Sequence, residues 1–576
     1  RKYHLRNLVT HYLNCPLLTM MNPIFLLLFC LAGCAFANPA SSNDPEVVAP
    51  IGRIRGSIIK SRLGKDIYSF RGVRYGNPPV GQQRFQIATP ATDWNDDVFD
   101  ASEEGPACIN LYGLEKDMSE DCLRLNVYST KGDDVKRPVL VFFHPGGFYD
   151  LSGQSFNFGP QYLLDHDLVL VTVNYRLGSL GFLSTGDSLA PGNLGLKDQV
   201  FALRWIKRNI AAFGGDRDSV TITGYSAGAL SVALHMISPM SKDLFHRAIA
   251  MSGSFLSNVP YPTEQKHLAR RQAELLDCPT DTTGSMLICL NSKPVQNFTD
   301  TAGKFFDWYW NPVLLWSPVV EPEIQGVERF IPAQPFDLIR QGKFHQVPLI
   351  TGIAKDEFGV KRHRLGNDTM YQELNDEWDR LAPISFQYER ETNRSRYISQ
   401  ELRKFYFGDQ PISHNNSKGI ADLYADSLII FMVHRGAQLV AANSKQPVYF
   451  YKFTYQGRYS VAKWNETSNY GVVHHDDLQY LYFMKAFFPY FDADAPEIEM
   501  VKRYTAMWAN FVENGEPIPQ CNELFENVTW DRYVPEKDNY LDITLEPSMK
   551  TGVFPDRMAL FDRLFPLTPL PETTKS

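Results

Sequence analysis

Short runs of apolar, mostly β-branched residues recur along the chain, and glycine-containing or polar turns often follow them. Such runs are typical of strands that are buried on both faces of a parallel sheet. We expect strands at residues 138–143, 168–173, 219–223, 248–251, 347–350 and 448–453. Helices are expected at 196–206, where apolar residues recur at helical spacing, and from Ser226 onward. This alternation indicates an α/β fold with a large central, mostly parallel sheet flanked by helices.

The turns that follow these strands are the expected location of chemistry, because open α/β sheets bind ligands at the carboxyl ends of their strands. Residues 224–228, Gly-Tyr-Ser-Ala-Gly, lie between an expected strand and an expected helix. About 0.2 such pentapeptides are expected by chance at ordinary glycine and serine frequencies, so the structural context carries the argument. A serine on so tight a turn needs small neighbours, which the glycines supply. The pattern predicts that Ser226 is a nucleophile.

A serine nucleophile needs a base to take its proton and an acid to orient that base. In α/β-hydrolases the chain order is Ser, then Asp or Glu, then His, so both partners should follow Ser226. Asp356 and Glu357 follow the strand expected at 347–350, and either can be the acid. His474 and His475 lie in a glycine-containing, acid-flanked segment, and spacing does not choose between them.

Stabilisation of an oxyanion is the other requirement of acyl transfer, and preorganised backbone N–H groups provide it. Residues 143–148, Phe-His-Pro-Gly-Gly-Phe, follow a central strand and can bring glycine amides close to a substrate oxygen.

The N-terminal region has the pattern of an exported protein. Residues 23–37 form an apolar run that ends in a small-residue cleavage pattern, as in secretory signals. The alternative is a membrane anchor, but the run is shorter than the ~20 apolar residues that span a bilayer. We expect 1–37 to comprise upstream residues and a signal peptide. The remainder, 38–576, is expected to form a single domain that begins with a flexible lead-in over 38–50.

Sequons and cysteines also favour a secreted, extracellular glycoprotein. Six Asn-x-Ser/Thr sequons occur, at Asn297, Asn367, Asn393, Asn415, Asn465 and Asn527. Among the cysteines after residue 37, Cys108 lies close in sequence to Cys122, and Cys278 lies close to Cys289. These spacings favour two short disulfide loops, although sequence does not prove the connectivity. Cys521 is left over and is expected to be a buried free thiol.

The composition limits the kinds of partner that the chain is expected to bind. The chain has 576 residues, 44% of them apolar, and a formal net charge of −8. That charge argues against nucleic acid as a partner, because a protein that binds the phosphate backbone needs a basic face. After residue 37, no apolar run long enough to anchor the chain in a membrane follows.

Several ordered segments resemble the type-B carboxylesterase/cholinesterase family, and especially its insect esterases. The resemblance covers nearly all of residues 45–565 and rests on 70–85, 119–128, 174–178, 193–199, 213–228, 507–511 and 540–543. It implies the α/β-hydrolase fold and a serine carboxylesterase that needs no cofactor or metal.

The resemblance also assigns residues that the pattern left open. It places the catalytic acid at Glu357 and the base at His474, and it implies oxyanion donors at the amides of Gly146, Gly147 and Ala227.

Two positions depart from the family pattern. Pro145, which has no N–H, replaces the first of three glycines. His475 stands where the family commonly has Gly.

Structural contacts follow from the resemblance as well. It supports the disulfides Cys108–Cys122 and Cys278–Cys289. It also implies two ion pairs, which join Arg84 to Glu120 and Arg176 to Asp198.

The expected substrate is a small-molecule ester, and two absences narrow it. Tyr225 stands where cholinesterases carry Glu, and residues 109–121 lack the Trp that would hold a quaternary ammonium, although Tyr112 offers a weaker aromatic face. We therefore expect a neutral, lipophilic carboxylic ester. One alternative is a juvenile hormone esterase-like hydrolase, whose members usually carry Gln at position 225. The other is a non-catalytic esterase-like adhesion or binding protein, which the filled triad positions disfavour.

Overall fold

The computed structural model describes residues 44–94, 97–112, 117–130, 135–364, 368–462, 470–520, 522–526 and 528–567. The chain divides into two units, Arg1–Asp44 and Pro45–Ser576, and every element below belongs to the second unit. The expected signal peptide and the domain boundary at residue 37 lie outside the described residues.

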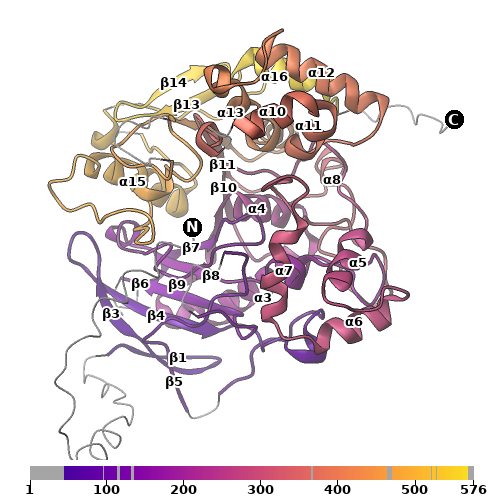
Figure 1. The fold of residues 1–576 in the computed structure, drawn as a ribbon. Coiled ribbons are helices and arrows are strands. Elements are labelled where there is room, and N and C mark those ends of the chain that lie inside the picture. Colours follow the sequence, from indigo (N-terminus) through magenta and orange to yellow (C-terminus); the bar gives the residue numbers. More distant parts are fainter. Residues whose placement is uncertain are drawn as a thin grey trace, which may run out of the picture. The chain divides into compact units, whose positions relative to one another are not determined.

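A large, mostly parallel sheet is the centre of this unit (Figure 1). Across the described residues it has 11 strands. The neighbours from β8 to β13 pair in parallel, and antiparallel strands complete both ends. In spatial order the strands are β14 (Ser548–Thr551), β13 (Asn539–Ile543), β12 (Val448–Phe453), β11 (Leu349–Ala354), β10 (Arg247–Met251), β9 (Gly215–Tyr225), β7 (Arg137–Phe143), β8 (Val169–Val173), β6 (Arg124–Ser129), β4 (Asp66–Arg74) and β3 (Ser57–Lys60).

Each apolar run expected as a strand lies in this sheet, in β7 to β12. The strand expected at 347–350 lies slightly later in the chain, at Leu349–Ala354. β11 continues through Thr351 and Gly352 to Ala354, because β10 and β12 on either side extend the parallel ladder.

A second, small sheet lies near the start of the unit. It contains β1 (Glu46–Ala49), β2 (Gly52–Arg55) and β5 (Val98–Asp100), with β2 in the middle. The expected flexible lead-in is therefore wrong for residues 46–49, because antiparallel pairing with β2 holds them as a strand.

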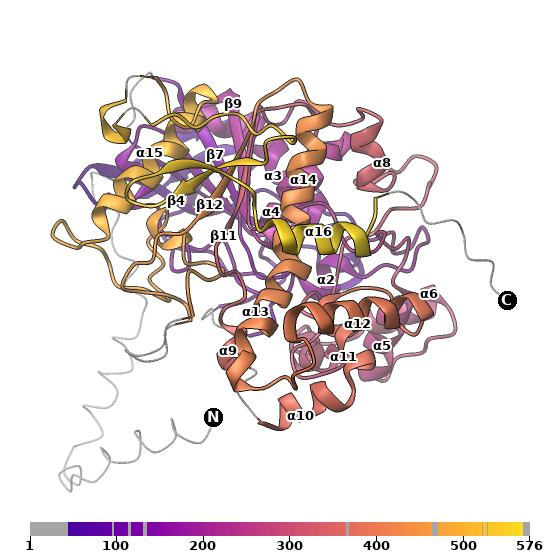
Figure 2. The same ribbon diagram turned by 90° about the horizontal axis from the view of Figure 1, so that it is seen from above.

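Helices cover both faces of the large sheet (Figure 2). α3, α4 and α14 pack on one face, and α15 packs on the other. Both expected helices are present, as α3 and α4. The helices are α2 (Gly178–Phe182), α3 (Leu194–Asn209), α4 (Ala227–Ile237), α5 (Lys266–Leu275), α6 (Thr283–Ser292), α7 (Gln296–Ala302), α8 (Pro335–Arg340), α9 (Lys361–Arg364), α10 (Asp368–Asp376), α11 (Trp378–Phe386), α12 (Asn393–Phe407), α13 (Ser417–Ala425), α14 (Phe431–Asn443), α15 (Ile498–Asn514) and α16 (Pro555–Leu564).

The two faces of the sheet each carry a hydrophobic core, which explains the apolar runs of the sequence. In β7, Val139 and Val141 point into one core, whereas Leu140 and Phe142 point into the other. Successive side chains of a strand alternate between faces, so a strand that is covered on both sides is apolar throughout.

Both expected disulfides are present. The S–S distance is 2.02 Å for Cys108–Cys122 and 2.06 Å for Cys278–Cys289. Cys521 lies outside the described residues.

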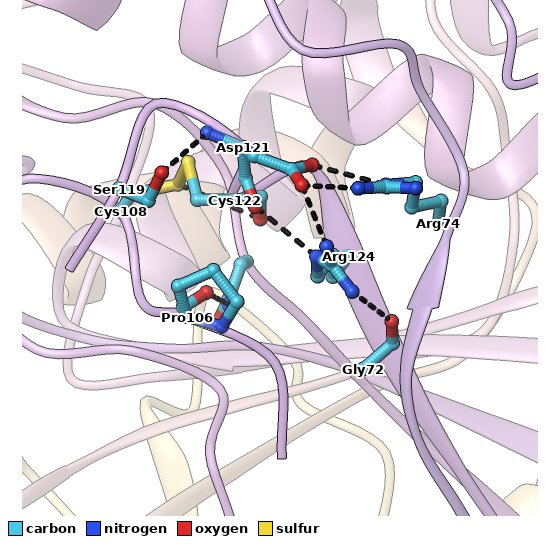
Figure 3. Close-up of polar contacts among 9 residues, drawn as sticks. Gly72, Arg74, Pro106, Cys108, Ser119, Asp121, Cys122 and Arg124 are labelled. Carbon is cyan, nitrogen blue, oxygen red and sulfur yellow. Dashed lines mark hydrogen bonds and ion pairs between the residues drawn. A yellow bond between two sulfur atoms is a disulfide. The ribbon is translucent and has the colours of Figure 1, made fainter. Parts of the chain in front are cut away.

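An ion-pair cluster braces the first disulfide loop (Figure 3). The carboxylate of Asp121 lies between the guanidinium groups of Arg74 and Arg124, 2.7 Å from the latter. Arg124 also donates to the carbonyl of Gly72 at 2.9 Å. Burial would raise the pKa of Asp121, but its hydrogen bonds with the two arginines hold that pKa below its ordinary value. The disulfide loop is therefore fixed to the adjacent sheet.

Both ion pairs expected from the resemblance are also formed, one in the interior (Arg176 with Asp198) and one partly buried (Arg84 with Glu120). Nε of Arg84 lies 2.6 Å from Oε1 of Glu120, and Nη2 of Arg176 lies 2.7 Å from Oδ1 of Asp198.

The expected glycosylation sites differ in exposure. Asn393 and Asn415 are exposed, whereas Asn297 is half-buried in α7. Asn367, Asn465 and Asn527 lie outside the described residues. Within the described ranges, no helix is both long enough and apolar enough to cross a membrane.

Candidate active site

Ser226 occupies the sharp turn between β9 and α4. Its backbone has φ 54° and ψ −118°, a strained conformation for a residue other than glycine. The turn is also crowded, because a Cβ on Gly224 would lie 2.3 Å from the carbonyl carbon of Gly228. A Cβ on Gly228 would lie 2.0 Å from the carbonyl oxygen of Phe143. The two glycines are therefore required by close backbone approach, as the sequence pattern predicted.

Glu357, in the segment after β11, and His474, in the segment after β12, form a direct pair. Nδ1 of His474 lies 2.5 Å from Oε2 of Glu357, and the backbone N–H of His474 donates to the Glu357 carbonyl at 2.9 Å. Oε1 of Glu357 accepts from the hydroxyl of Ser252 at 2.6 Å and from the backbone N–H of Ala354 at 2.8 Å. With Nδ1 engaged by Glu357, Nε2 is the nitrogen of His474 that remains to accept a proton.

Burial controls the electrostatics of this pair. Glu357 is fully buried, and desolvation raises its pKa to about 8, although the hydrogen bonds from Ser252 and Ala354 act to lower it. Desolvation also lowers the pKa of His474. Because the two groups are in direct contact, they gain and lose protons as a pair.

The geometry separates the alternatives that spacing left open. Asp356 directs Oδ2 to the backbone N–H of Val472, at 3.0 Å, rather than to either histidine ring nitrogen. His475 has φ 80° and donates its backbone N–H to the hydroxyl of Tyr225 at 2.9 Å. This left-handed backbone suits the glycine that the family commonly has at the position of His475.

The glycine turn that follows β7 lies at the carboxyl ends of the central strands, as Ser226 does. Gly146 has φ 115° and Gly147 has φ 59°. A Cβ on Gly146 would lie 2.0 Å from the carbonyl oxygen of Asp150, so the turn is too tight for a side chain there. The start of α4, which includes Ala227, packs against the end of β7 through Gly228. The amides implied as oxyanion donors therefore belong to two adjoining backbone segments beside Ser226.

Sequence reasoning missed the contacts of three side chains at this site. Ser252 holds Glu357, Tyr225 holds the His475 amide, and the ring of Phe358 stacks on that of His474 at 5.8 Å. The sequence did offer a signal for Ser252, because this residue directly follows the strand expected at 248–251. No sequence signal marked the contact between Tyr225 and His475, because it joins residues 250 positions apart in the chain.

A metal centre was not expected from the sequence. In the part of the chain that the structure describes, no group of three or more His, Cys, Asp or Glu side chains is placed to hold a metal ion.

A serine on a strained strand–helix turn, a histidine–carboxylate pair and a glycine turn at the edge of a parallel sheet define the α/β-hydrolase class. Residues 43–561 match the family model described as the carboxylesterase family. The chain therefore belongs to the carboxylesterase family, and it is a carboxylic ester hydrolase.

Named relatives agree with this assignment. Esterase FE4 of Myzus persicae is 38% identical over 520 residues, which cover 87% of this chain and 90% of the relative. Juvenile hormone esterase of Tribolium castaneum is 33% identical over 552 residues, covering 91% and 92%. The crystal structure of juvenile hormone esterase from Manduca sexta, with OTFP covalently attached, superimposes with a TM-score of 0.82 at 28% identity. That similarity covers 91% of this chain and 100% of the other.

Proposed function

We propose that this ester hydrolase uses Ser226 as nucleophile, His474 as general base and Glu357 as the acid that orients the base. The 2.5 Å contact between His474 and Glu357 carries this proposal, because it orients an imidazole whose ring lies 4.8 Å from that of Tyr225, the residue before Ser226. The strained backbone of Ser226 supports it, since such strain is retained where the surroundings hold a residue for function.

The reaction is a two-step acyl transfer. Nε2 of His474 takes the hydroxyl proton of Ser226 while Oγ attacks the ester carbonyl carbon, and Glu357 stabilises the resulting imidazolium. The imidazolium then gives its proton to the departing alcohol, which leaves an acyl group on Ser226. Water next gives a proton to His474 and attacks the acyl carbon. The imidazolium returns this proton to Oγ of Ser226 as the bond between Oγ and the acyl carbon breaks, and the carboxylic acid is released.

The amides of Gly146, Gly147 and Ala227 donate to the oxyanion that forms in both steps. Such donors act strongly because they are already oriented before charge develops. The positive φ values of Gly146 and Gly147 support this role, since they let consecutive amides turn toward one point.

We propose neutral, lipophilic carboxylic esters as the substrate class. Tyr225 is fully buried and its hydroxyl accepts from the His475 amide, so this position places no carboxylate beside a cationic substrate. Hydrolysis of a juvenile hormone is the second candidate, because relatives named juvenile hormone esterase occur in Tribolium castaneum and Heliothis virescens.

We also propose that the chain is a secreted, single-domain glycoprotein cleaved after Ala37. The two disulfides and the exposed sequons at Asn393 and Asn415 support export.

An ester panel tests the function. Wild type and the Ser226→Ala variant would be assayed with p-nitrophenyl esters of increasing acyl length, a choline ester and a juvenile hormone. We expect wild type to hydrolyse the neutral esters fastest and Ser226→Ala to be inactive on all. Equal activity of the two proteins would contradict the nucleophile, and a preference for the choline ester would contradict the substrate class. An inactive wild type with every substrate would favour an adhesion or binding role.

A further inference from the structure

Tyr225 joins the two halves of the proposed catalytic site. It is the last residue of β9, it directly precedes Ser226, and its side chain is fully buried. Its hydroxyl accepts a hydrogen bond from the backbone N–H of His475 at 2.9 Å. The residue next to the nucleophile therefore holds the residue next to the base.

The conformation of His475 explains why this hydrogen bond matters. A φ of 80° is unfavourable for a residue with a Cβ, and it persists only where the surroundings stabilise it. The hydroxyl of Tyr225 accepts from the amide of that strained residue. Without it, the amide would lose its acceptor and the loop would be free to relax toward a conformation with negative φ.

Other contacts tie the loop of residues 471–478, which contains His474 and His475, to different parts of the structure. The backbone N–H of His474 is held by the Glu357 carbonyl at 2.9 Å, which ties the loop to the segment after β11. The N–H of Val473 donates to the carboxylate of Asp476 at 2.9 Å, which closes the loop on itself. The hydrogen bond of Tyr225 ties the loop to β9, the strand that ends at the nucleophile.

The ring of Tyr225 acts on the base as well. It packs edge-on against the imidazole of His474, with 4.8 Å between the ring centroids. It also lies 5.0 Å from the ring of His475. The same side chain therefore supports the ring of His474 and the backbone that follows it.

We infer that Tyr225 is a positioning residue, which sets the geometry of His474 relative to Ser226 by holding the His475 amide from the end of the nucleophile strand. This inference rests on the proposed function, because it gives Tyr225 a part in the same reaction. Tyr225 is expected to touch neither the substrate nor the reacting atoms.

Tyr225→Phe tests the inference, because it removes the hydroxyl and keeps the ring. Tyr482→Phe is the matched control: Tyr482 is also fully buried, and among the described residues its hydroxyl has no hydrogen-bond partner. Both variants would be compared with wild type and Ser226→Ala on one neutral ester. Rates would be expressed per active site, titrated with an organophosphate, and amide hydrogen exchange would be followed in peptides that cover residues 471–478.

We expect Tyr225→Phe to lower kcat at least roughly tenfold, with KM unchanged within about twofold. Tenfold corresponds to the loss of the His475 hydrogen bond alone, and the hydroxyl also interacts with Ser252 and Asp477. Exchange in the 471–478 peptides should become faster, and Tyr482→Phe should match wild type in every readout. An unchanged kcat per active site in Tyr225→Phe would overturn the inference, even if thermal stability fell, because the role would then be structural alone.

The same panel separates this inference from the proposed function. If wild type is active, Ser226→Ala is inactive and Tyr225→Phe equals wild type, the inference fails and the triad stands. If hydrolysis does not depend on Ser226, both fail.

Discussion

Glu357 is fully buried and His474 is mostly buried, and the charges of these two side chains depend on each other. In the proposed mechanism the pair works with an ionised Glu357 and a neutral His474, and so carries one buried negative charge. Burial penalises that charge, as the raised pKa of Glu357 shows. The pair is therefore expected to hold an additional, inhibiting proton more tightly than a solvent-exposed imidazole would.

This coupling predicts the direction of the acid limb of activity. As the pH falls, the pair takes up a proton and the base is lost, so kcat/KM should decrease. The proton is taken up by the pair and not by His474 alone, so the lowered pKa of His474 does not set the midpoint. The midpoint should lie at or above about 6.5, the ordinary pKa of histidine, because burial favours the protonated, uncharged pair and raises the pKa of Glu357. A profile of kcat/KM from pH 5 to 9 measures it. A rate that is flat over this range, or a midpoint near pH 5, would contradict His474 as the base.

Gly146 allows a second prediction at the scale of one residue. Gly146→Ala would place a Cβ 2.0 Å from the carbonyl oxygen of Asp150. The turn must therefore move, and its amides would no longer point toward the oxyanion. We expect kcat to fall about 100- to 1,000-fold, the usual effect of losing one oxyanion donor. Gly64→Ala is the control, since Gly64 also has positive φ, at 81°, but no described heavy atom lies within 4 Å of its added Cβ. Equal activities of the two variants would argue against the oxyanion role.

At the scale of elements, the buried ion pair of Arg176 and Asp198 joins two segments that pack beside the candidate site. Arg176 lies in the segment after β8, and Asp198 lies in α3, which packs on the sheet. The guanidinium group binds both carboxylate oxygens, at 2.7 and 2.8 Å, and both side chains are almost fully buried. Removing one partner therefore leaves a charge without compensation in the interior.

Asp198→Asn should lower the free energy of unfolding by about 3–5 kcal/mol, because Arg176 stays buried and charged. Asp93→Asn is the matched control, since its pair with Arg208 spans 3.4 Å and both side chains are about half exposed, at 50% and 54%. It should change the free energy of unfolding by less than about 1 kcal/mol. Urea unfolding curves measure both. A loss below about 1 kcal/mol for Asp198→Asn would show that the pair does not brace the fold.

The central elements could be predicted from the sequence because they are buried on both faces. Runs such as 138–143 are apolar at every position, and the structure places this one in β7, between the two cores. The outer strands carry weaker signals. β3 (Ser57–Lys60) mixes exposed and half-buried positions, so no apolar run marks it. β1 (Glu46–Ala49) was mistaken for part of a flexible segment because its stability comes from pairing with β2.

The whole molecule brings together site segments that are far apart in sequence. Ser226 follows β9, Glu357 follows β11 and His474 follows β12. The parallel order of β9, β10, β11 and β12 brings the carboxyl ends of these strands together. Chain order and local motifs nominated Ser226 and left two candidates each for the acid and the base, between which the family resemblance chose. They were not enough for Ser252 or for the backbone contact of Tyr225, which depend on the packing of neighbouring strand ends.

Export is a prediction about the whole chain. If residues 23–37 act as a secretory signal, expression of the full sequence in insect cells should release a protein that begins at Asn38. Treatment with an N-glycosidase should lower its mass, since Asn393 and Asn415 are exposed. N-terminal sequencing and mass spectrometry of the medium measure both. Retention in the cell with residues 1–37 attached would contradict secretion.

Covalent labelling is the most direct test of the central claim that Ser226 is the nucleophile of this ester hydrolase. Diethyl p-nitrophenyl phosphate would be incubated with wild type and with Ser226→Ala, and the products analysed by intact mass and peptide mapping. We predict one diethylphosphoryl group per wild-type chain, bound to Ser226, with activity lost in proportion to labelling, and no adduct on Ser226→Ala. A stoichiometric adduct on Ser226→Ala, or inactivation of wild type by an adduct at another residue, would contradict the account.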